Sequence, residues 1–252
     1  MILAVDAGNS SVSFGLFDDK KVVAVFRAES RRGATADEYR DFLDSRMVRA
    51  GVMSTDVKGS VVACVVPQLV HVFFEALKGF GGAPLLVSPR LKLPITIKYS
   101  TPELLGADRI ASASEAFTVH GGPVVVIDFG TATTFSLVDG TGAFIGGAIA
   151  PGMLTGYHAL TERASGLPRA GLTFPKKAIG RDTGEGIQSG VIFGHAAMAE
   201  GLVERFRAEL GADLKVVVTG GMAETVSPHM KGVEASDQLL SLKGLASIFR
   251  LN

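Results

Sequence analysis

Short apolar runs that end in small polar residues are the most regular pattern in this chain. Val124–Ile127 is a continuous β-branched run, which predicts a buried strand. It leads into Asp128–Thr134, and a second apolar strand, Phe135–Val138, follows at once before a turn at Asp139-Gly140. The pattern predicts a hairpin whose tip carries a carboxylate, a glycine and hydroxyl groups, a combination that can bind an anion or a cation.

The same pattern occurs at the start of the chain. Ile2–Val5 leads into Asp6–Ser11, and Val12–Phe17 leads out. An offset of 122 residues aligns Asp6 with Asp128, Gly8 with Gly130 and Ser11 with Thr133. Since Asp-x-Gly is a common turn, each tip taken alone is also explained as a simple hairpin. The duplication favours two similar half-domains with a ligand between their tips.

The remaining elements complete both halves. Val22–Arg27 extends the first hairpin into a meander, and Thr35 forms a capping box with Glu38 that opens a helix to about Ala50. The first half continues with a strand at Ser60–Val66, a helix at Val70–Leu77, a strand at Leu85–Val87 and a helix at Ile110–His120. In the second half we expect a strand at Ala143–Ile149, a helix from Gly180 to Leu210, a strand at Leu214–Thr219 and a final amphipathic helix at Asp237–Arg250.

The order βββ-α-β-α-β is typical of a ribonuclease-H-like or actin-like half. We therefore predict an α/β fold of duplicated ribonuclease-H-like (actin-like) halves, each a mixed sheet with helices, with a nucleotide cleft between them. The halves are expected at residues 1–117 and 118–252. Glycines recur through the long helix at Gly184, Gly186, Gly190, Gly194 and Gly201, which indicates either close contact with another helix, for example in a second subunit, or a weak helix.

Composition narrows the function classes. The 252 residues are 47% apolar with a mean hydropathy of +0.32, enough for a substantial core. Lys+Arg and Asp+Glu are both 25, so we expect neither a nucleic-acid nor a membrane surface. Met1 runs straight into a strand, so no signal peptide is expected, and no apolar run reaches membrane-span length. Cys64 is the single cysteine, which favours a core role and a cytoplasmic location.

A nucleotide held between the two tips would meet suitable groups on both. Gly8 lets the backbone approach a phosphate closely. Further donors follow it at Asn9, Ser10, Ser11 and Ser13, and the second tip offers Gly130, Thr131 and Thr133. Asp6 would repel a phosphate unless a cation, normally Mg2+, bridges them. The chain has no Gly-x-x-x-x-Gly-Lys-Ser/Thr run, which excludes a P-loop.

Asp108, in the segment Gly106–Arg109, is the candidate base. A free Asp has a pKa of about 3.9 and is a weak base toward an alcohol. Phosphoryl transfer has a loose transition state, so alignment of the hydroxyl matters more than its early deprotonation. Arg109 would pair with an anionic substrate group. The alternative is an ordinary helix N-terminus with a favourable Asp and a solvated Arg.

Taken in order, these motifs resemble those of the type III pantothenate kinases, within the acetate-and-sugar-kinase, heat-shock-chaperone and actin superfamily. The ordered set covers essentially the whole chain and is more specific than any single motif. The matching segments are Asp6–Ser10, Tyr99, Leu105–Arg109, Asp128–Thr133, Gly146–Gly152, Leu167-Pro168, Pro175, Ile179–Thr183, Gln188–Gly190 and Thr219–Gly221.

The resemblance implies ATP-dependent phosphorylation of pantothenate to 4'-phosphopantothenate, the first step of coenzyme A biosynthesis. It implies that Asp108 accepts the hydroxyl proton, that Asp128 binds a monovalent cation (K+ or NH4+), and that Asp6 holds Mg2+ through water. The implied ATP-binding residues are Asp6, Ala7, Gly8, Asn9, Ser10, Ser11, Val12, Ser13 and Thr131. The implied pantothenate-binding residues are Tyr99, Gly106, Ala107, Asp108, Arg109 and Thr183.

The family is dimeric, so the resemblance also implies a homodimer with the substrate pocket completed across the interface. Ser10 and Ser11 depart from the commoner Thr and Asn of the motif, and both keep a polar donor. Three other readings remain open: a kinase for another small hydroxylated acid or sugar, a non-catalytic accessory homologue, and an actin-like filament former. The three carboxylates Asp6, Asp108 and Asp128 argue against an idle homologue, and the short chain argues against a filament former.

Overall fold

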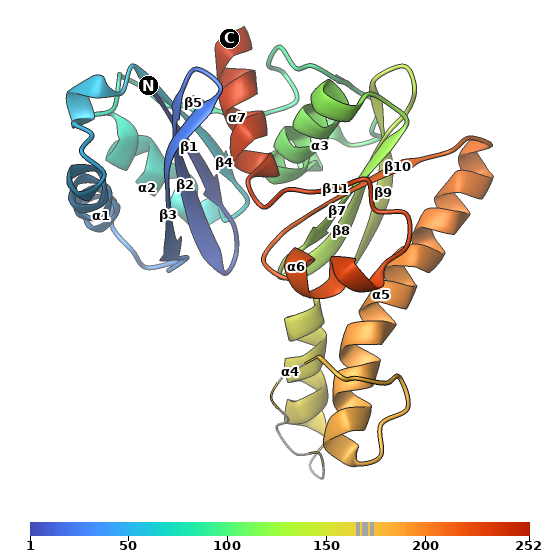
Figure 1. The fold of residues 1–252 in the computed structure, drawn as a ribbon. Helices are drawn as coiled ribbons and strands as arrows, with labels where there is room; N and C mark the ends of the chain where they lie inside the picture. The colour runs from blue at the N-terminus through green and yellow to red at the C-terminus, as the bar shows by residue number, and fades with distance from the viewer. Residues whose placement is uncertain (165–166, 168–170, 172–173) are drawn as a thin grey trace. The chain divides into compact units, whose positions relative to one another are not determined.

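The computed structural model describes residues 1–164, 167, 171 and 174–252 (Figure 1). Pro168 of the family motif lies outside the described residues. The chain divides into two compact units, one of residues 1–119 with 239–252 and the other of residues 120–238. This division differs from the predicted halves mainly at the end of the chain, because the last helix belongs to the first unit.

The first unit holds one mixed sheet in the order β3-β2-β1-β4-β5. Its strands are β1 (Ile2–Ala7), β2 (Ser11–Asp18), β3 (Lys21–Glu29), β4 (Gly59–Cys64) and β5 (Leu85–Leu86), with the short β6 (Thr96–Ile97) further along the chain. Its helices are α1 (Ala36–Arg49), α2 (Pro67–Leu77), α3 (Ala107–His120) and α7 (Leu240–Leu251), with 3-10 turns at Ser54–Asp56 and Pro102–Leu104. The first three strands pair antiparallel, which confirms the predicted meander, and β4 adds parallel to β1.

Successive side chains of β1 point to opposite faces of the sheet, and different helices cover these two faces. Leu3 and Val5 are fully buried and belong to one cluster with residues of α1 and α2. Asp6 points to the opposite face, where α7 packs on β1 (Figure 1). The predicted capping box of α1 is confirmed, since Thr35 and Glu38 bond reciprocally. Helix α2 starts at Pro67, earlier than predicted, because Pro is well suited to the first helical position.

The second unit repeats the same plan. Its strands are β7 (Val124–Phe129), β8 (Ala132–Val138), β9 (Ala143–Pro151), β10 (Lys215–Thr219) and β11 (Ala235–Ser236), and its helices are α4 (Met153–Arg163), α5 (Thr183–Leu210) and α6 (Ala223–Val226), with a 3-10 turn at Ser227–His229. Within this unit the strands run β11-β10-β7-β8-β9. Read from the meander outward, this order matches that of the first unit, which confirms the duplicated ribonuclease-H-like halves.

The strand register corrects one detail of the predicted repeat. Asp6 lies opposite Ser13, seven residues on, whereas Asp128 lies opposite Thr134, six residues on. The first tip closes through Gly8 N–H to the Ser11 carbonyl at 3.0 Å, and the second through Gly130 N–H to the Ala132 carbonyl at 3.1 Å. The second tip is therefore one residue shorter, and Ser11 corresponds to Ala132 rather than to Thr133.

Helix α5 is longer than the sheet it covers. Its C-terminal half packs on the sheet through Ile192, Ala196, Ala199 and Val203, in one cluster with strands β7, β8 and β10. Its N-terminal half runs beside α4 beyond the sheet of the second unit (Figure 1). A Cβ added at Gly186, Gly190, Gly194 or Gly201 would meet nothing within 4 Å, so these glycines face open space within the described chain.

Candidate active site

Asp6 stands at the carboxyl end of the central strand β1. Its neighbours across the sheet are Ser13 on β2 and Ala63 on β4. From the covering helix α7, the Ser241 hydroxyl donates a hydrogen bond of 2.5 Å to Asp6 Oδ2. The pKa of Asp6 is raised from 3.8 to about 6. Burial is the largest cause and the negative charge of Asp108 acts in the same direction, while the Ser241 hydrogen bond and the Arg27 charge oppose the rise.

Asp108 lies in the first turn of α3, close enough to Asp6 for their charges to interact. Burial raises its pKa, while a hydrogen bond of 2.8 Å from the Arg109 backbone N–H to Asp108 Oδ1 and the charge of Arg109 partly offset the rise. A Cβ at Gly106 would lie 2.4 Å from Asp108 Oδ1, so the carboxylate occupies space that only glycine leaves free. The first unit thus brings two predicted carboxylates together.

The tip between β1 and β2 divides into exposed and buried positions. Asn9 and Ser10 are exposed, and Gly8 and Ser11 are half-buried. Ala7 and Val12, which the resemblance places in the ATP site, are fully buried in the core cluster of the first unit. These two residues can therefore offer a ligand only their backbone groups. Ser13, half-buried beside Asp6, keeps its side chain on the same sheet face as that carboxylate.

In the second unit, Asp128 sits at the end of β7 opposite Thr219 of β10. Two glycines leave room for its carboxylate. A Cβ would lie 2.3 Å from Asp128 Oδ1 if added at Gly220, whose φ is +95°, and 3.3 Å from the same atom if added at Gly130. A side chain at either position would therefore crowd Asp128 Oδ1, most severely at Gly220.

The hydroxyl residues of the second tip have different surroundings. The Thr131 side chain is exposed, while its carbonyl accepts hydrogen bonds from Gly152 N–H at 3.1 Å and from Thr155 Oγ1 at 2.7 Å. Thr133 is fully buried, and its Oγ1 lies 3.3 Å from Nε2 of His195 on α5. The expectation that Thr133 contacts a phosphate is therefore wrong, because its hydroxyl faces the interior of the unit.

The residues predicted to bind the acceptor are divided between the units. Tyr99, Ala107 and Arg109 belong to the first unit together with Asp108. Thr183 belongs to the second, where it is the exposed first residue of α5, directly after the capping residue Asp182. Thr183 and Asp108 therefore belong to different units of the chain.

Three further observations concern metal cages, membrane-spanning helices and the cysteine. Among the described residues, no three His, Cys, Asp or Glu side chains converge as a metal cage. None of the described helices combines the length and the apolar character that a membrane crossing needs. Cys64 packs beside the first core, and burial raises the pKa of its thiol, so the thiol stays protonated at neutral pH.

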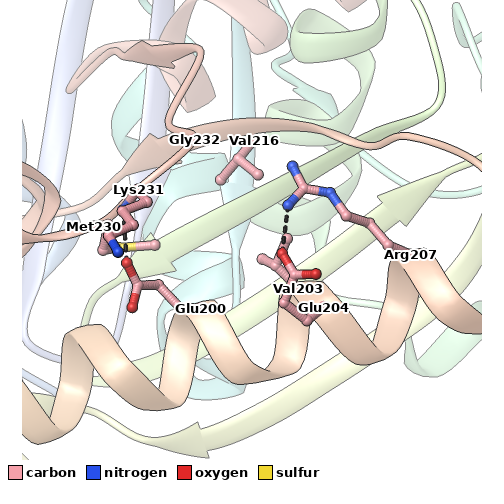
Figure 2. A pocket seen from close by; sticks show the side chains of 8 residues that line it. All are labelled: Glu200, Val203, Glu204, Arg207, Val216, Met230, Lys231 and Gly232. Atoms are coloured by element: carbon pink, nitrogen blue, oxygen red, sulfur yellow. Dashed lines mark hydrogen bonds and ion pairs between the residues drawn. The ribbon is translucent and has the colours of Figure 1, made fainter.

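A cavity of roughly 230 Å³ lies elsewhere, between α5, β10 and the segment before β11 (Figure 2). Its lining residues are Glu200, Val203, Glu204, Arg207, Val216, Met230, Lys231 and Gly232. Figure 2 shows Arg207 directed at Glu204, with which it forms a hydrogen bond of 2.7 Å. None of the predicted site residues lines this cavity, and Glu200, Glu204 and Arg207 of its lining already make internal hydrogen bonds.

Comparisons with known proteins identify relatives that match this chain over its full length. The family model described as type III pantothenate kinase matches residues 2–205. The chain is 36% identical over 253 residues to a type III pantothenate kinase of Halalkalibacterium halodurans, covering 100% of both chains. It is 40% identical to one of Roseiflexus castenholzii, covering 100% of this chain and 99% of the relative.

This chain belongs to the type III pantothenate kinase family. Its fold is also similar to the solved structure of a conserved Baf family protein from Campylobacter jejuni, with a TM-score of 0.64, 20% identity, and coverage of 98% of this chain and 97% of that one. Family membership accounts for the ordered motifs around Asp6, Asp108 and Asp128.

Two residues that shape this candidate site were missed from the sequence. Ser241 reaches Asp6 from 235 residues away, and no local pattern marks it. Gly220 shapes the surroundings of Asp128, and its only signal was the Thr219-Gly220-Gly221 motif at the end of a predicted strand.

Proposed function

We propose that this chain transfers the γ-phosphoryl group of ATP to the primary hydroxyl of pantothenate, forming 4'-phosphopantothenate. The observation that carries the proposal is the pair of neighbouring, half-buried carboxylates Asp6 and Asp108 in a member of this family. One carboxylate serves the nucleotide and the other serves the acceptor alcohol. The reaction is the first step of coenzyme A biosynthesis, and the cytoplasm is the compartment we propose for it.

Asp108 is the proton acceptor in this proposal. Burial raises its pKa, which makes it a stronger base toward an alcohol than a solvated Asp. The hydrogen bond from Arg109 N–H fixes Oδ1 in place and leaves Oδ2 for the substrate hydroxyl. Arg109, half-buried in the same turn, supplies the positive charge that suits the carboxylate of pantothenate.

Asp6 and the tip Gly8–Ser13 are the proposed nucleotide site of the first unit, and Thr131 is that of the second. The residues fit a hydrated Mg2+: Asp6 offers hard oxygen, the nearby Asp108 adds negative charge, and no acidic cage among the described residues would strip the ion of water and phosphate ligands. When bound, Mg2+ supplies positive charge to the phosphates. The Gly8 N–H donates to the Ser11 carbonyl, and Asn9 and Ser10 are the exposed residues of the tip, so we assign the nucleotide contacts of the tip to these two residues.

Asp128 is the proposed ligand of a monovalent cation, K+ or NH4+. The residues fit such an ion, because the carboxylate lies where the bare backbone of Gly130 and Gly220 leaves space that a Cβ would fill. The oxygen donors of Asp128 and its sheet neighbour Thr219 suit a hard cation. Asp128→Asn should therefore lose stimulation by K+ while keeping its Mg2+ requirement, and unchanged K+ stimulation would remove this assignment.

A homodimer is the proposed assembly, with the acceptor pocket completed by the partner. The segment formed by α4 and the first half of α5 extends beyond its own sheet (Figure 1). Leu154 and Leu160 of α4 are 42% and 41% exposed, Ile179 in the connection before α5 is 83% exposed, and the α5 glycines face open space. We assign Thr183, the exposed first residue of α5, to the acceptor pocket of the second copy.

Complementation tests the shared pocket directly. Asp108→Asn and Thr183→Ala chains are each expected to form weakly active homodimers. Co-expressed, they should form heterodimers in which one site keeps both Asp108 and the partner-donated Thr183, so activity returns. If each chain supplied its own Thr183, both sites of the heterodimer would carry a defect and activity would stay low.

The substrate assignment is tested by ADP release with a panel of acceptors in buffer containing Mg2+ and K+. Pantothenate should support turnover at least tenfold above any other small hydroxylated acid or sugar, and the product should carry one phosphate on its primary hydroxyl. Turnover of a different acceptor with no response to pantothenate would replace the proposed substrate.

A further inference from the structure

The hydrogen bond between Ser241 and Asp6 joins the two ends of the chain at the site. Ser241 lies in the first turn of α7, and its Oγ donates to Asp6 Oδ2 across a sequence separation of 235 residues. No motif of the family resemblance includes it. Asp6 stands beside a second negative charge at Asp108, so the orientation of its two oxygens decides what the carboxylate can hold.

Helix α7 is fixed firmly enough to hold this contact in one geometry. Leu242, Leu245 and Ile248 are buried, and α7 packs on β1, β2 and β4 of its own unit. A Cβ at Gly244 would lie 2.0 Å from the Ala111 carbonyl oxygen, so α7 and α3 approach each other at backbone distance. The same helix thus contacts α3, which carries Asp108, and delivers a hydroxyl to Asp6.

A serine at this place does more than fill space. Its hydroxyl donates to one carboxylate oxygen and thereby leaves the other, Oδ1, as the acceptor available to a ligand. A hydrogen bond to an ionised group is stronger than one between neutral groups, and it selects a single rotamer of a short side chain. The half-buried setting of Ser241 limits competition from solvent.

We propose that Ser241 is a positioning residue for the nucleotide site: it holds Asp6 Oδ2, so that Oδ1 faces the nucleotide and its hydrated cation. This inference rests on the proposed function of Asp6. It assigns the C-terminal helix a role in nucleotide affinity and gives it no part in acceptor binding.

The test compares Ser241→Ala, Ser241→Thr and Ser247→Ala. Ser247 is a matched control, because its Oγ also donates from α7 to a carboxylate, Glu115 Oε2 at 2.8 Å, away from Asp6. Calorimetric titration of ADP, with and without Mg2+ and in the absence of pantothenate, gives a readout that does not depend on turnover. Steady-state kinetics then separate the KM for ATP from the KM for pantothenate.

Loss of a hydrogen bond to a charged group corresponds to about tenfold or more in affinity. Ser241→Ala should therefore weaken Mg2+-dependent ADP binding and raise the KM for ATP by about that factor, with the KM for pantothenate within twofold of wild type. Ser241→Thr should restore ADP affinity to within threefold, and Ser247→Ala should leave it unchanged.

Several results would overturn the inference. ADP affinity of Ser241→Ala within twofold of wild type would do so, as would an equal loss in Ser247→Ala, which would indicate a general effect of helix packing. Asp6→Asn separates this failure from failure of the proposed function: if Asp6→Asn binds Mg2+-ADP normally, the role of Asp6 itself is wrong. In the Asp6→Asn background, Ser241→Ala should add no further loss, because it acts through that carboxylate.

Discussion

Replacing Gly106 by alanine should reduce catalysis while leaving the fold nearly intact. The new Cβ would lie 2.4 Å from Asp108 Oδ1, whereas ordinary contacts begin at 3.4 Å, so the carboxylate must move by about 1 Å. Beyond Asp108 and the two chain neighbours of Gly106, the nearest atom is Val65 Cγ1, which lies 3.7 Å from the new Cβ, an ordinary contact distance, and is not disturbed. A displacement of roughly 1 Å at a reacting group costs about 10²-fold in rate, or about 2.7 kcal/mol.

The stability of the same variant should change little. Moving the carboxylate weakens its hydrogen bond from Arg109 N–H, which costs about 1 kcal/mol. Alanine restricts the unfolded chain, which returns about 0.4–1 kcal/mol. The free energy of unfolding should therefore stay within about 1 kcal/mol of wild type.

The assay is pantothenate-dependent ADP release together with thermal unfolding. Gly33→Ala is the matched control, because Gly33 is an exposed glycine of the same unit whose Cβ would meet nothing within 4 Å. We expect kcat of Gly106→Ala to fall by about 10²-fold and that of Gly33→Ala to stay at the wild-type value. A kcat within threefold of wild type for Gly106→Ala would refute the reasoning, since the position of Asp108 would then not limit the rate.

Two further predictions concern Asp6 and Thr133. The pKa of Asp6 is raised from 3.8 to about 6, so the folded state holds the proton more tightly, and wild-type stability falls as the pH rises from about 4 to 6. Without nucleotide, Asp6→Asn should therefore be more stable than wild type by roughly 3 kcal/mol at pH 7.5 and by much less at pH 4. Denaturant titrations at the two pH values measure this difference. An equal gain at both would contradict the raised pKa of Asp6. Thr133→Val removes the hydrogen bond to His195, so the free energy of unfolding should fall by about 1 kcal/mol while the KM for ATP stays unchanged. A fivefold rise in that KM would indicate that Thr133 does contact a phosphate.

Local patterns predicted the local elements well. The β-branched run Val124–Ile127 and the capping box at Thr35 each act over a few residues, so their signals are complete in the sequence, and both appear in the structure as β7 and the start of α1. The duplicated tips also predicted two similar halves, and the two units do share their strand order. A fixed offset could not detect that the second tip is one residue shorter, and for that reason Thr133 was aligned with Ser11 and expected to contact a phosphate.

Contacts between residues far apart in the sequence could not be predicted from local patterns. Amphipathicity predicted the final helix, but it does not identify the surface that an apolar face covers, so the packing of α7 on β1 was not foreseen. For the same reason, Asp6 was expected to meet a phosphate and a cation, and its contact with Ser241 was not. The raised pKa of Asp108 depends on burial in the folded unit, which the surrounding sequence does not reveal.

The most direct test of the account is a comparison of Asp108→Asn with wild type at saturating ATP and pantothenate. Loss of a general base corresponds to about 10²–10⁴-fold in rate. We predict a fall of that size in kcat, with ADP affinity unchanged or tighter, because the repulsion between Asp108 and Asp6 is removed. A variant that folds, binds ADP and retains more than a tenth of the wild-type kcat would contradict the central claim.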